Sequence, residues 1–507
     1  DITPSRHHPS LHQAYIYHKT SRRKGRQLKS MLRVTPIYGC DTQKVFNNND
    51  SGISSSLATA PQSTLVEYGG VRVLINVGWD ESLLLPSGEE EGESKNALQN
   101  LPSPSEVDVI LITDSTLSSL GGLPLYLSSA ASTPRIYGTF PTVKMGQMTL
   151  YDHHASLSLD GKDPGYALSS VDELFSPSRF TTLRYSQTLT LFSSSSPDKT
   201  EAISVTPHRA GRVVGASYFV LKRLADETEV VVAPYYHHAK ERHLDSSSLH
   251  KYGAAADVLI TCPGGPRGLL GSLYSSSSSS QRNKKPILNS PLVSRAHGEF
   301  IQMIMGTLRR NGNVLIPVDA SGRVLELLLV LSQHWDRNRL AAAYNLCWVG
   351  PMAWNTIEFA RSQLEWMATP LGAQFDTQRG HPYALKSVHI CSSVAELDAI
   401  MDASNGNPTA VLASGSTLDC GPARDLLLKW AENPDNAIVL TDSTRCVLRG
   451  EILESRRDVL NVSEGVVAGG GTIAAAASSA AASVSTGIVS SALVTAKSKV
   501  TIIPDAT

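Results

Sequence analysis

Four side chains in the stretch APYYHHAKERHL (233–244) could bind a metal ion. His237, His238 and His243 supply imidazole nitrogens and Glu241 supplies a carboxylate, and these are groups that hold zinc in proteins. Adjacent side chains in an extended segment point to opposite sides, so the two neighbouring histidines cannot form one face of a metal site by themselves. No common zinc-ligand spacing links the four residues. Solvated or hydrogen-bonded histidines are therefore the simpler interpretation.

The segment VDASGR (318–323) could bind an anion. An apolar strand precedes it and an amphipathic helix follows it, so its backbone N–H groups could point toward a phosphate. A purely structural role explains the residues better: Ser321 would cap the helix, Gly322 would make the tight turn, and the leucines that follow would pack on a sheet. Neither a P-loop nor a G-x-G-x-x-G motif supports nucleotide binding. The structural role is the preferred interpretation.

Other motifs of catalysis and metal binding are missing from the sequence. There is no G-x-S-x-G nucleophile elbow. Six cysteines occur singly, without a C-x-x-C pair or a short spacing suited to structural zinc, and this usage favours a reducing compartment. They are Cys40, Cys262, Cys347, Cys391, Cys420 and Cys446.

Length and composition indicate a globular protein of more than one folded unit. The chain has 507 residues, a formal net charge of −1, 18% charged residues and 41% hydrophobic residues, which are ordinary values for a globular protein. A polyanionic partner would therefore have to bind a local basic patch. The long uncharged run from Gly465 to Ala496 consists of Ala, Ser, Gly, Thr and Val and lacks the Leu, Ile and Phe of a membrane span. We expect no membrane contact.

The two ends of the chain differ in composition from its centre. Residues 1–30 are polar and carry a basic cluster, which predicts a disordered extension and leaves open a nuclear-localisation or RNA-contacting arm. Residues 455–507 lose hydrophobic periodicity and are expected to form a low-complexity tail. Serine-rich runs at 193–196 and 275–280 are interpreted as hydrophilic insertions.

The first half of the folded region is predicted to be rich in strands. LVEY and VRVLINVGWD (65–80) form a hairpin pattern with a turn at Gly69-Gly70, and the pattern of short apolar strands continues through residues 202–234. The strand VDVILIT (107–113) runs into a short polar turn, after which Gly-Gly-Leu-Pro (121–124) opens a helix.

The pattern changes near Asp257. From there, six segments each begin with a short apolar strand, and most continue into an amphipathic helix. This alternation predicts a doubly wound α/β unit with a largely parallel sheet. The segments begin DVLITCPGG, GNVLIPVDASGR, YNLCWVGPMAW, SVHICSSVAEL, PTAVLASGSTLD and NAIVLTDS.

Taken in order, these segments resemble the metallo-β-lactamase/β-CASP proteins of RNA 3′-end processing. The resemblance implies an αββα metallo-β-lactamase domain at 31–252 followed by a β-CASP cassette at 253–454. The ordered set spans roughly 65–454 and is more specific than any single motif. Its carrying segments are LINVGWDE, the 111–127 loop ending GGLPLYL, HRAGRVVGASYFVLKR, YYHHAKERHL, GNVLIPVDASGRVLELLLVLSQHW, NTIEFARSQLEWM and LASGSTLDCGPARDLLLKWAENPDNAIVLT.

The same resemblance implies that the metal ligands of active relatives have been replaced. Their His-x-His-x-Asp-His loop matches a segment with one carboxylate and three hydroxyls. An asparagine replaces a strand-end aspartate, an arginine replaces the histidine of the third motif, a tyrosine replaces the bridging aspartate, and a cysteine replaces a β-CASP acid. In order along the chain, the degenerate positions are Asn76, Asp114, Thr116, Ser118, Ser119, Arg212, Tyr235 and Cys262.

These replacements do not suit a dinuclear zinc site. Ser and Thr hydroxyls stay protonated near neutral pH and are poor zinc ligands. Arg212 would place a permanent cation where the metal charge should lie, and two unit charges at ~4 Å repel by several kcal/mol even at an effective dielectric near ~20. We therefore expect no catalytic residues, no metal and no cofactor, and we expect Arg212 to pair with Asp114.

The resemblance implies a non-catalytic subunit of the nuclear machinery that cleaves and polyadenylates pre-mRNA. Its expected partners are the endonuclease subunit of the cleavage and polyadenylation specificity factor, other subunits with a symplekin-like scaffold, and pre-mRNA. The residues that contact RNA cannot be named from the sequence. Two alternatives stay open: an active zinc-dependent hydrolase with a rearranged site around His208, His237, His238 and His243, and the analogous inactive subunit of the Integrator complex.

Overall fold

A computed structural model defines the fold over most of the central part of the chain. Cys262, the serine-rich runs and most of both terminal segments lie outside the residues that it describes. The described residues are 15–18, 32–38, 62–79, 97–128, 134–192, 202–261, 291–377, 380–416, 418, 420–441 and 499–502.

The first of three sheets carries the strand before the 114–119 loop. Its strands follow one another in chain order, β2-β3-β4-β5-β6-β7, with antiparallel pairing up to β4 and parallel pairing after it. The predicted hairpin between β3 and β4 is confirmed, and its turn uses Gly69 and Gly70 at φ 56° and 73°, a conformation that glycine adopts without strain. The strands are β2 (Leu32–Tyr38), β3 (Ser63–Tyr68), β4 (Val71–Ile75), β5 (Val109–Leu111), β6 (Arg135–Thr139) and β7 (Phe180–Leu183).

The second sheet has the order β1-β12-β11-β10-β9-β8. Two expectations are wrong here. The strand VLIT, which we assigned to the second unit, pairs with β11 as β12, because an apolar strand has the same pattern in either sheet. Part of the extension expected to be disordered forms β1, which pairs with β12. The strands are β1 (Tyr15–His18), β8 (Leu189–Phe192), β9 (Ala202–Arg209), β10 (Ser217–Arg223), β11 (Glu229–Ala233) and β12 (Val258–Thr261).

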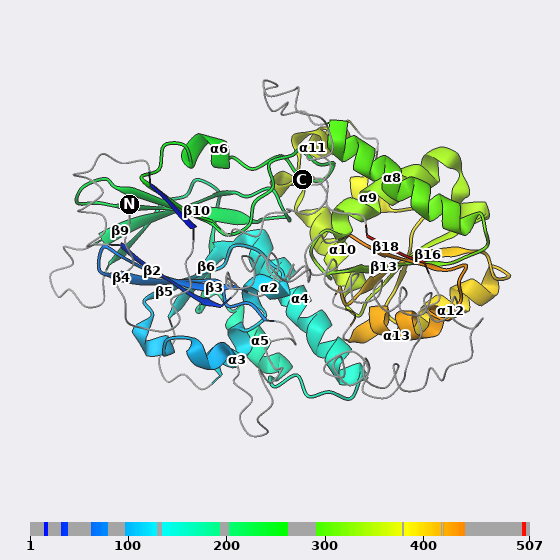
Figure 1. Cartoon of the computed structure of the whole chain (residues 1–507), viewed down its shortest axis with the longest axis horizontal. Coiled ribbons are helices and arrows are strands. Elements are labelled where there is room, and N and C mark those ends of the chain that lie inside the picture. The colour runs from blue at the N-terminus through cyan, green and yellow to red at the C-terminus, as the bar shows by residue number, and fades with distance from the viewer. Residues whose placement is uncertain are drawn as a thin grey trace, which may run out of the picture.

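These two sheets pack face to face, and helices cover their outer surfaces (Figure 1). Side chains such as Val66 and Val73 of one sheet and Phe219 and Val232 of the other share a core between the sheets. A further core joins the first sheet to the helices on its outer face. The predicted αββα sandwich is thus confirmed. Its helices are α2 (Leu117–Leu120), α3 (Leu123–Leu127), α4 (Phe140–Leu159), α5 (Leu168–Leu174) and α6 (Leu249–Tyr252), with short 3-10 turns η2 (Ala97–Asn100) and η3 (Pro104–Glu106).

The third sheet is parallel throughout and has the order β15-β14-β16-β13-β17-β18. Residues 499–502, which we placed in the low-complexity tail, form its edge strand β18 beside β17. The strands are β13 (Val314–Val318), β14 (Asn345–Val349), β15 (His389–Cys391), β16 (Thr409–Ser414), β17 (Ala437–Leu440) and β18 (Lys499–Ile502).

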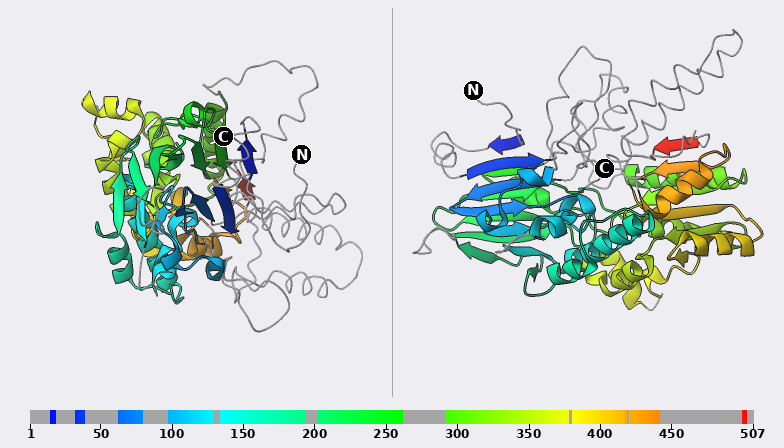
Figure 2. Two further views of the ribbon diagram at one scale, coloured as in Figure 1. Left: turned by 90° about the vertical axis from the view of Figure 1, so that its left-hand side faces the viewer. Right: turned by 90° about the horizontal axis from the view of Figure 1, so that it is seen from below.

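Helices cover both faces of this third sheet, as the doubly wound pattern predicts (Figure 2). One core holds α8, α9, α10 and α11, and another holds α12 and α13. Because β13 leads into α9 while its neighbour β16 leads into α13, the connections of these adjacent strands leave toward opposite faces. The helices are α8 (Pro291–Leu308), α9 (Val324–Asn338), α10 (Ala353–Ser362), α11 (Thr369–Asp376), α12 (Val394–Ala403) and α13 (Gly421–Trp430), with 3-10 turns η4 (Leu340–Ala342), η5 (Leu364–Trp366) and η6 (Pro382–Ala384).

The sandwich and the doubly wound unit share a packed boundary. Helix α4 lies between them (Figure 1) and contacts both α10 and α13. Met145 of α4, Val214 and Leu244 belong to the same hydrophobic core as α8 and α9. Among the described residues, no helix is both long enough and apolar enough to span a bilayer.

Candidate functional site

The loop after β5, which carries the predicted degenerate ligands, is fixed by its backbone. Carbonyl groups of residues 117–119 accept hydrogen bonds from the N–H groups of Trp79, Gln62 and Val77 at 2.9, 3.1 and 2.9 Å. A Cβ built on Gly78 would lie 2.0 Å from a carbonyl oxygen of the loop. Main-chain contacts and close packing therefore hold the loop in its conformation.

Asn76 joins the end of β4 to the start of the loop. It is fully buried and has φ 60°, in the left-handed region that asparagine tolerates better than most residues. Its Nδ2 donates to Thr113 Oγ1 at 2.8 Å, and its Oδ1 accepts from Thr113 N–H at 2.9 Å. Because an amide both donates and accepts, Asn76 bonds to Thr113 through both its nitrogen and its oxygen.

The loop residues Asp114, Thr116 and Ser118 bond mainly to one another. Asp114 Oδ1 accepts from Thr116 N–H at 3.0 Å and from Thr116 Oγ1 at 2.7 Å, and the Thr116 and Ser118 hydroxyls are 2.9 Å apart. Ser119 is also buried, and its Oγ has no hydrogen-bond partner among the described residues. The structure thus brings these four predicted positions together. One carboxylate with three hydroxyls does not fit a dinuclear zinc centre.

Arg212 and Tyr235 lie against each other beside this loop. The guanidinium carbon of Arg212 is 4.5 Å from the centroid of the Tyr235 ring, a cation–π arrangement. The expected pairing of Arg212 with Asp114 stays a prediction. The linear sequence did not reveal this ring contact.

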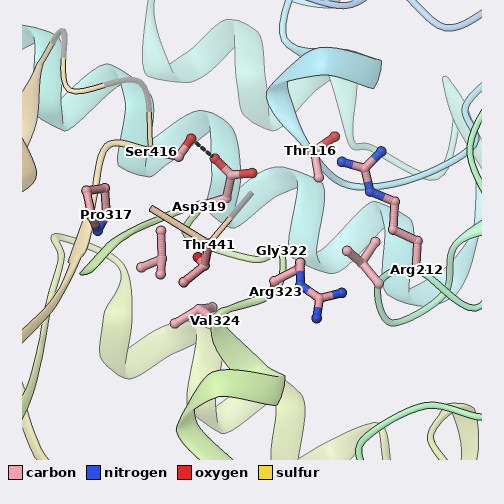
Figure 3. Close-up of a pocket in the computed structure, with 11 residues that line it drawn as sticks. Thr116, Arg212, Pro317, Asp319, Gly322, Arg323, Val324, Ser416 and Thr441 are labelled. Carbon is pink, nitrogen blue, oxygen red and sulfur yellow. Dashed lines mark hydrogen bonds between the residues drawn. The ribbon is translucent and has the colours of Figure 1, made fainter. Parts of the chain in front are cut away.

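A pocket of about 350 Å³, measured with its open mouth, separates this loop from the third sheet (Figure 3). It lies at the carboxyl ends of β13, β16 and β17, where adjacent connections diverge, and ligands of open α/β sheets bind at such points. Ser416 donates to Asp319 across it. The lining residues are Thr116, Arg212, Val213, Pro317, Val318, Asp319, Gly322, Arg323, Val324, Ser416 and Thr441.

Ser321 does not cap the helix as expected. Helix α9 begins at Val324, and the Ser321 hydroxyl instead hydrogen-bonds to Ser115 of the 114–119 loop at 3.1 Å and to Thr149 of α4. This side chain therefore joins the two halves of the molecule. Its role depends on residues that are far away in the sequence, which is why local capping preferences misassigned it.

The histidines considered for a rearranged metal site do not all converge. His208 stacks on Tyr252, with ring centroids 3.9 Å apart, and burial lowers its pKa. His238 is exposed. His237 is buried, and burial together with the positive charge of Arg323 lowers its pKa to about 3, so its imidazole is neutral at physiological pH.

His243 belongs instead to a buried group of charged side chains between the two halves, which we call the interdomain cluster: Glu241, His243, Arg323 and Glu326. His243 Nδ1 is 2.8 Å from Glu326 Oε2 and 3.5 Å from Glu241 Oε2. Arg323 Nη2 is 2.8 Å from Glu241 Oε1. Glu326, on α9, also accepts from the backbone N–H groups of Arg242 at 3.2 Å and His243 at 2.9 Å.

The pKa values of the two carboxylates of the interdomain cluster shift in opposite directions. Burial alone would raise the pKa of Glu326, but the hydrogen bonds and charge of His243 outweigh it and lower the pKa to about 2. Burial raises the pKa of Glu241 despite the neighbouring Arg323 guanidinium. Glu326 is therefore the firmly ionised anchor of the cluster, because it receives several N–H donors while Glu241 receives mainly one.

Three members of the cluster also have the spacing of a metal site. One ligand atom each from Glu241, His243 and Glu326 lies within 4.8 Å of the others. Glu326 already accepts two backbone N–H groups, and Arg323 supplies a cation at hydrogen-bond distance. These contacts fit an ion-pair network that joins the two halves better than they fit a metal centre.

Sequence reasoning missed Glu326 and Arg323, although one of them left a signal. Glu326 is the single charged residue in the apolar run VLELLLVL (324–331). A charge on an otherwise buried helix face requires a partner, which could have pointed to a buried contact. Its partner His243 lies 83 positions away, so the sequence alone could not identify it.

Asp152 of α4 forms a further buried contact across the boundary. It is buried, and its Oδ1 accepts from Met352 N–H at 3.3 Å. Burial raises its pKa to about 6, an effect that Met352 and Ser414 reduce and the nearby Asp319 increases. This carboxyl is the reverse of Glu326, because too few donors surround it to stabilise its ionised form.

Comparison with known protein families gives both halves an identity. A family model described as "Metallo-beta-lactamase superfamily domain" matches residues 65–262, and one described as "Beta-Casp domain" matches residues 324–445. The chain is a metallo-β-lactamase/β-CASP protein. The first match extends through β12, in agreement with the pairing of that strand in the sandwich.

Its similar relatives carry names from mRNA 3′-end processing. The chain is 32% identical over 393 residues to the probable cleavage and polyadenylation specificity factor subunit 2 of Drosophila melanogaster, covering 77% of this chain and 46% of that protein. It is 30% identical over 425 residues to cleavage and polyadenylation specificity factor subunit 2 of Arabidopsis thaliana, covering 84% and 49%. The chain thus spans about half the length of these curated relatives.

A more distant relative is named as an enzyme. The chain is 25% identical over 337 residues to endoribonuclease ysh1 of Schizosaccharomyces pombe, covering 66% of this chain and 39% of that protein. The chain is thus similar both to relatives named as processing-factor subunits and to a relative named as an endoribonuclease. Which of them the chain resembles in function depends on its own site residues.

Proposed function

We propose that the chain is a non-catalytic subunit of the nuclear complex that cleaves and polyadenylates pre-mRNA. Its two domains would occupy about 31–252 and 253–454. Strand β12 lies after that boundary but belongs to the first domain. The partners in this proposal are the endonuclease subunit of that complex, a symplekin-like scaffold and pre-mRNA. The names of the more similar relatives support the process.

One observation carries the non-catalytic part of the proposal. The positions that match the metal-ligand motif are filled by Asp114 with hydrogen-bonded hydroxyls, and Arg212 stacks on Tyr235 beside them. A dinuclear zinc site needs several imidazole and carboxylate ligands to compensate for the dehydration of two divalent ions. The guanidinium of Arg212 is a permanent cation, and it would repel zinc ions bound next to it.

Metal analysis of the purified protein tests this proposal. The expected result is less than one tightly bound zinc per chain by plasma mass spectrometry, and no cleavage of a pre-mRNA substrate carrying a polyadenylation signal. An active endonuclease of the same family, purified in parallel, is the positive control for metal loading and cleavage. Two tightly bound metals per chain with cleavage activity would overturn the proposal.

A second candidate, an active zinc-dependent hydrolase with a rearranged site, is favoured by one feature. The interdomain cluster has a metal-like spacing, and its atoms Glu241 Oε2 and His243 Nε2 are buried without hydrogen-bond partners among the described residues, a gap that a water molecule or an ion could fill. Metal content that disappears in His243→Ala together with cleavage activity would favour this candidate.

Affinity purification addresses the choice of complex. A tagged full-length chain is expected to copurify with the endonuclease subunit of the cleavage and polyadenylation machinery from nuclear extract. Copurification with Integrator subunits instead would favour the alternative complex. Recovery in a cytoplasmic fraction without either set of partners would contradict both assignments.

A further inference from the structure

A group of basic side chains gathers where α8 and α9 end. Arg309 directly follows the last residue of α8, and Arg337 lies in the last turn of α9, one turn after His334. Arg242 reaches the same place from the first domain, where its Nη1 donates to Gln333 Oε1 at 2.7 Å. Three separate segments thus bring positive charge to one surface.

The two helix-end arginines are exposed and not neutralised by neighbours. Within the part of the chain that the structure describes, neither Arg309 nor Arg337 forms an ion pair or a side-chain hydrogen bond, and both are exposed. The acid next to them, Asp336, accepts a hydrogen bond from Ser387. Glu326 lies beneath the surface, fully buried and held in the interdomain cluster.

The positive charges of these arginines affect the pKa of His334, which lies among them. Burial lowers the pKa of His334, and the positive charges of Arg242, Arg309 and Arg337 lower it further. All three guanidinium groups therefore lie close enough to His334 to act on its imidazole.

The chemistry of this surface distinguishes between classes of partner. None of the exposed large hydrophobic side chains among the described residues lies on α8 or α9. Protein interfaces depend on buried aromatic and aliphatic anchors at their centre, which this surface lacks. Guanidinium groups without such anchors suit a chain of phosphates, each of which accepts paired N–H donors.

We propose that the surface formed by Arg242, Arg309, His334 and Arg337 binds the phosphate backbone of single-stranded RNA. We call it the arginine surface. This inference rests on the proposed function, which places the protein next to pre-mRNA, and adds to it the residues that make the contact. Since phosphate contacts carry no base information, binding at the arginine surface is independent of sequence.

The test measures binding of the full chain to a fluorescently labelled oligouridylate by anisotropy over a range of salt concentrations. The variant Arg309→Gln/Arg337→Gln removes two charges and leaves Arg242 and the interdomain cluster unchanged. Single-stranded binding loses about 0.7 in the slope of log K against log salt for each phosphate contact, so a loss of about 1.4 is expected, equivalent to roughly 25-fold weaker binding at ~0.1 M salt.

A matched double variant controls for the loss of charge. Arg135→Gln/Arg184→Gln removes two exposed arginines of the first domain, and its salt slope and affinity are expected to match those of the wild type. Thermal melts of both variants check that they are folded. An unchanged slope in Arg309→Gln/Arg337→Gln, or an equal loss in the control variant, overturns the proposal.

Competition distinguishes RNA from an acidic protein partner. Unlabelled oligouridylate is expected to displace the probe far better than polyglutamate of equal charge, and a preference for polyglutamate overturns the assignment to RNA. A chain that copurifies with the endonuclease subunit and binds no oligouridylate would contradict the arginine surface alone. A chain that binds RNA and carries two metals would contradict the proposed function alone.

Discussion

The 114–119 loop and the interdomain cluster have opposite chemistry although both lie at the boundary between the domains. In the loop, the backbone is tightly held while its side chains are hydroxyls and one carboxylate. In the cluster, two carboxylates, an imidazole and a guanidinium remain together in the protein interior. Charged side chains therefore join the domains at the cluster, whereas backbone contacts hold the loop in place.

The largest expected effect comes from removing the anchor of the interdomain cluster. Glu326→Gln is expected to lower the free energy of unfolding by about 3 kcal/mol or more at pH 7, since it leaves the remaining buried charges without their counter-ion. Urea denaturation followed by tryptophan fluorescence measures the change. Glu358→Gln, which removes the exposed partner of Arg361, is the control and is expected to cost less than about 1 kcal/mol.

The same variant should change the response to acid. The pKa of Glu326 in the folded protein, about 2, lies below its ordinary value of 4.5, so its stabilising contribution is present above pH 4.5 and is lost as the pH falls toward 2. Glu326→Gln should therefore lose less stability than the wild type over that interval. Equal acid sensitivity in both proteins would mean that the cluster does not join the domains electrostatically.

Asp152 provides the opposite test, because its pKa is raised whereas that of Glu326 is lowered. Its folded-state pKa, about 6, lies above the ordinary 3.8, so its contribution is most favourable below pH 3.8 and is lost as the pH rises through 6. At pH 7 this costs up to about 3 kcal/mol. Asp152→Asn should therefore raise the midpoint of thermal unfolding at pH 7 but not at pH 4, measured by differential scanning fluorimetry. A variant that is less stable at pH 7 would contradict this.

The packing of the 114–119 loop can be tested separately from its chemistry. Gly78→Ala places a methyl group 2.0 Å from Ser118 O, so the loop must shift, at a cost of about 1–3 kcal/mol. Gly372→Ala in α11, where an added Cβ meets nothing within 4 Å, is the control and should be neutral or slightly stabilising. Equal denaturation midpoints for the two variants would show that the loop is less tightly held than its contacts imply.

The smallest effect is expected at Arg212, which matches a histidine position of the metal-ligand motif. Arg212→His restores one imidazole, but the hydroxyls of Thr116, Ser118 and Ser119 still replace the other ligands. The zinc content measured by plasma mass spectrometry should therefore equal that of the wild type. A gain of one zinc per chain would show that the loop is closer to a working metal site than its side chains indicate.

Local sequence patterns were sufficient for most of the architecture. The hairpin at Gly69-Gly70, the helix that opens at residues 121–124 and the parallel strand-helix units all depend on periodicity and turn residues within short windows. The sheet that β12 joins could not be inferred this way, because its neighbour is chosen by long-range pairing.

The candidate site was predictable in composition but not in contacts. The family resemblance brought the 114–119 positions, Arg212 and Tyr235 together, as the structure does. It did not reveal that Arg212 stacks on Tyr235. The contacts of Glu326 also escaped sequence reasoning, since they join two domains through residues more than 80 positions apart.

Arg242 couples two parts of the molecule that have so far been treated separately. Its main-chain N–H is bonded to Glu326 inside the interdomain cluster, and its guanidinium is bonded to Gln333 at the arginine surface. Both acceptors lie on α9, nearly two helical turns apart. A polyanion that binds at the outer end of α9 would therefore exert a force along a rigid helix. That force would act directly on the contact between the two domains.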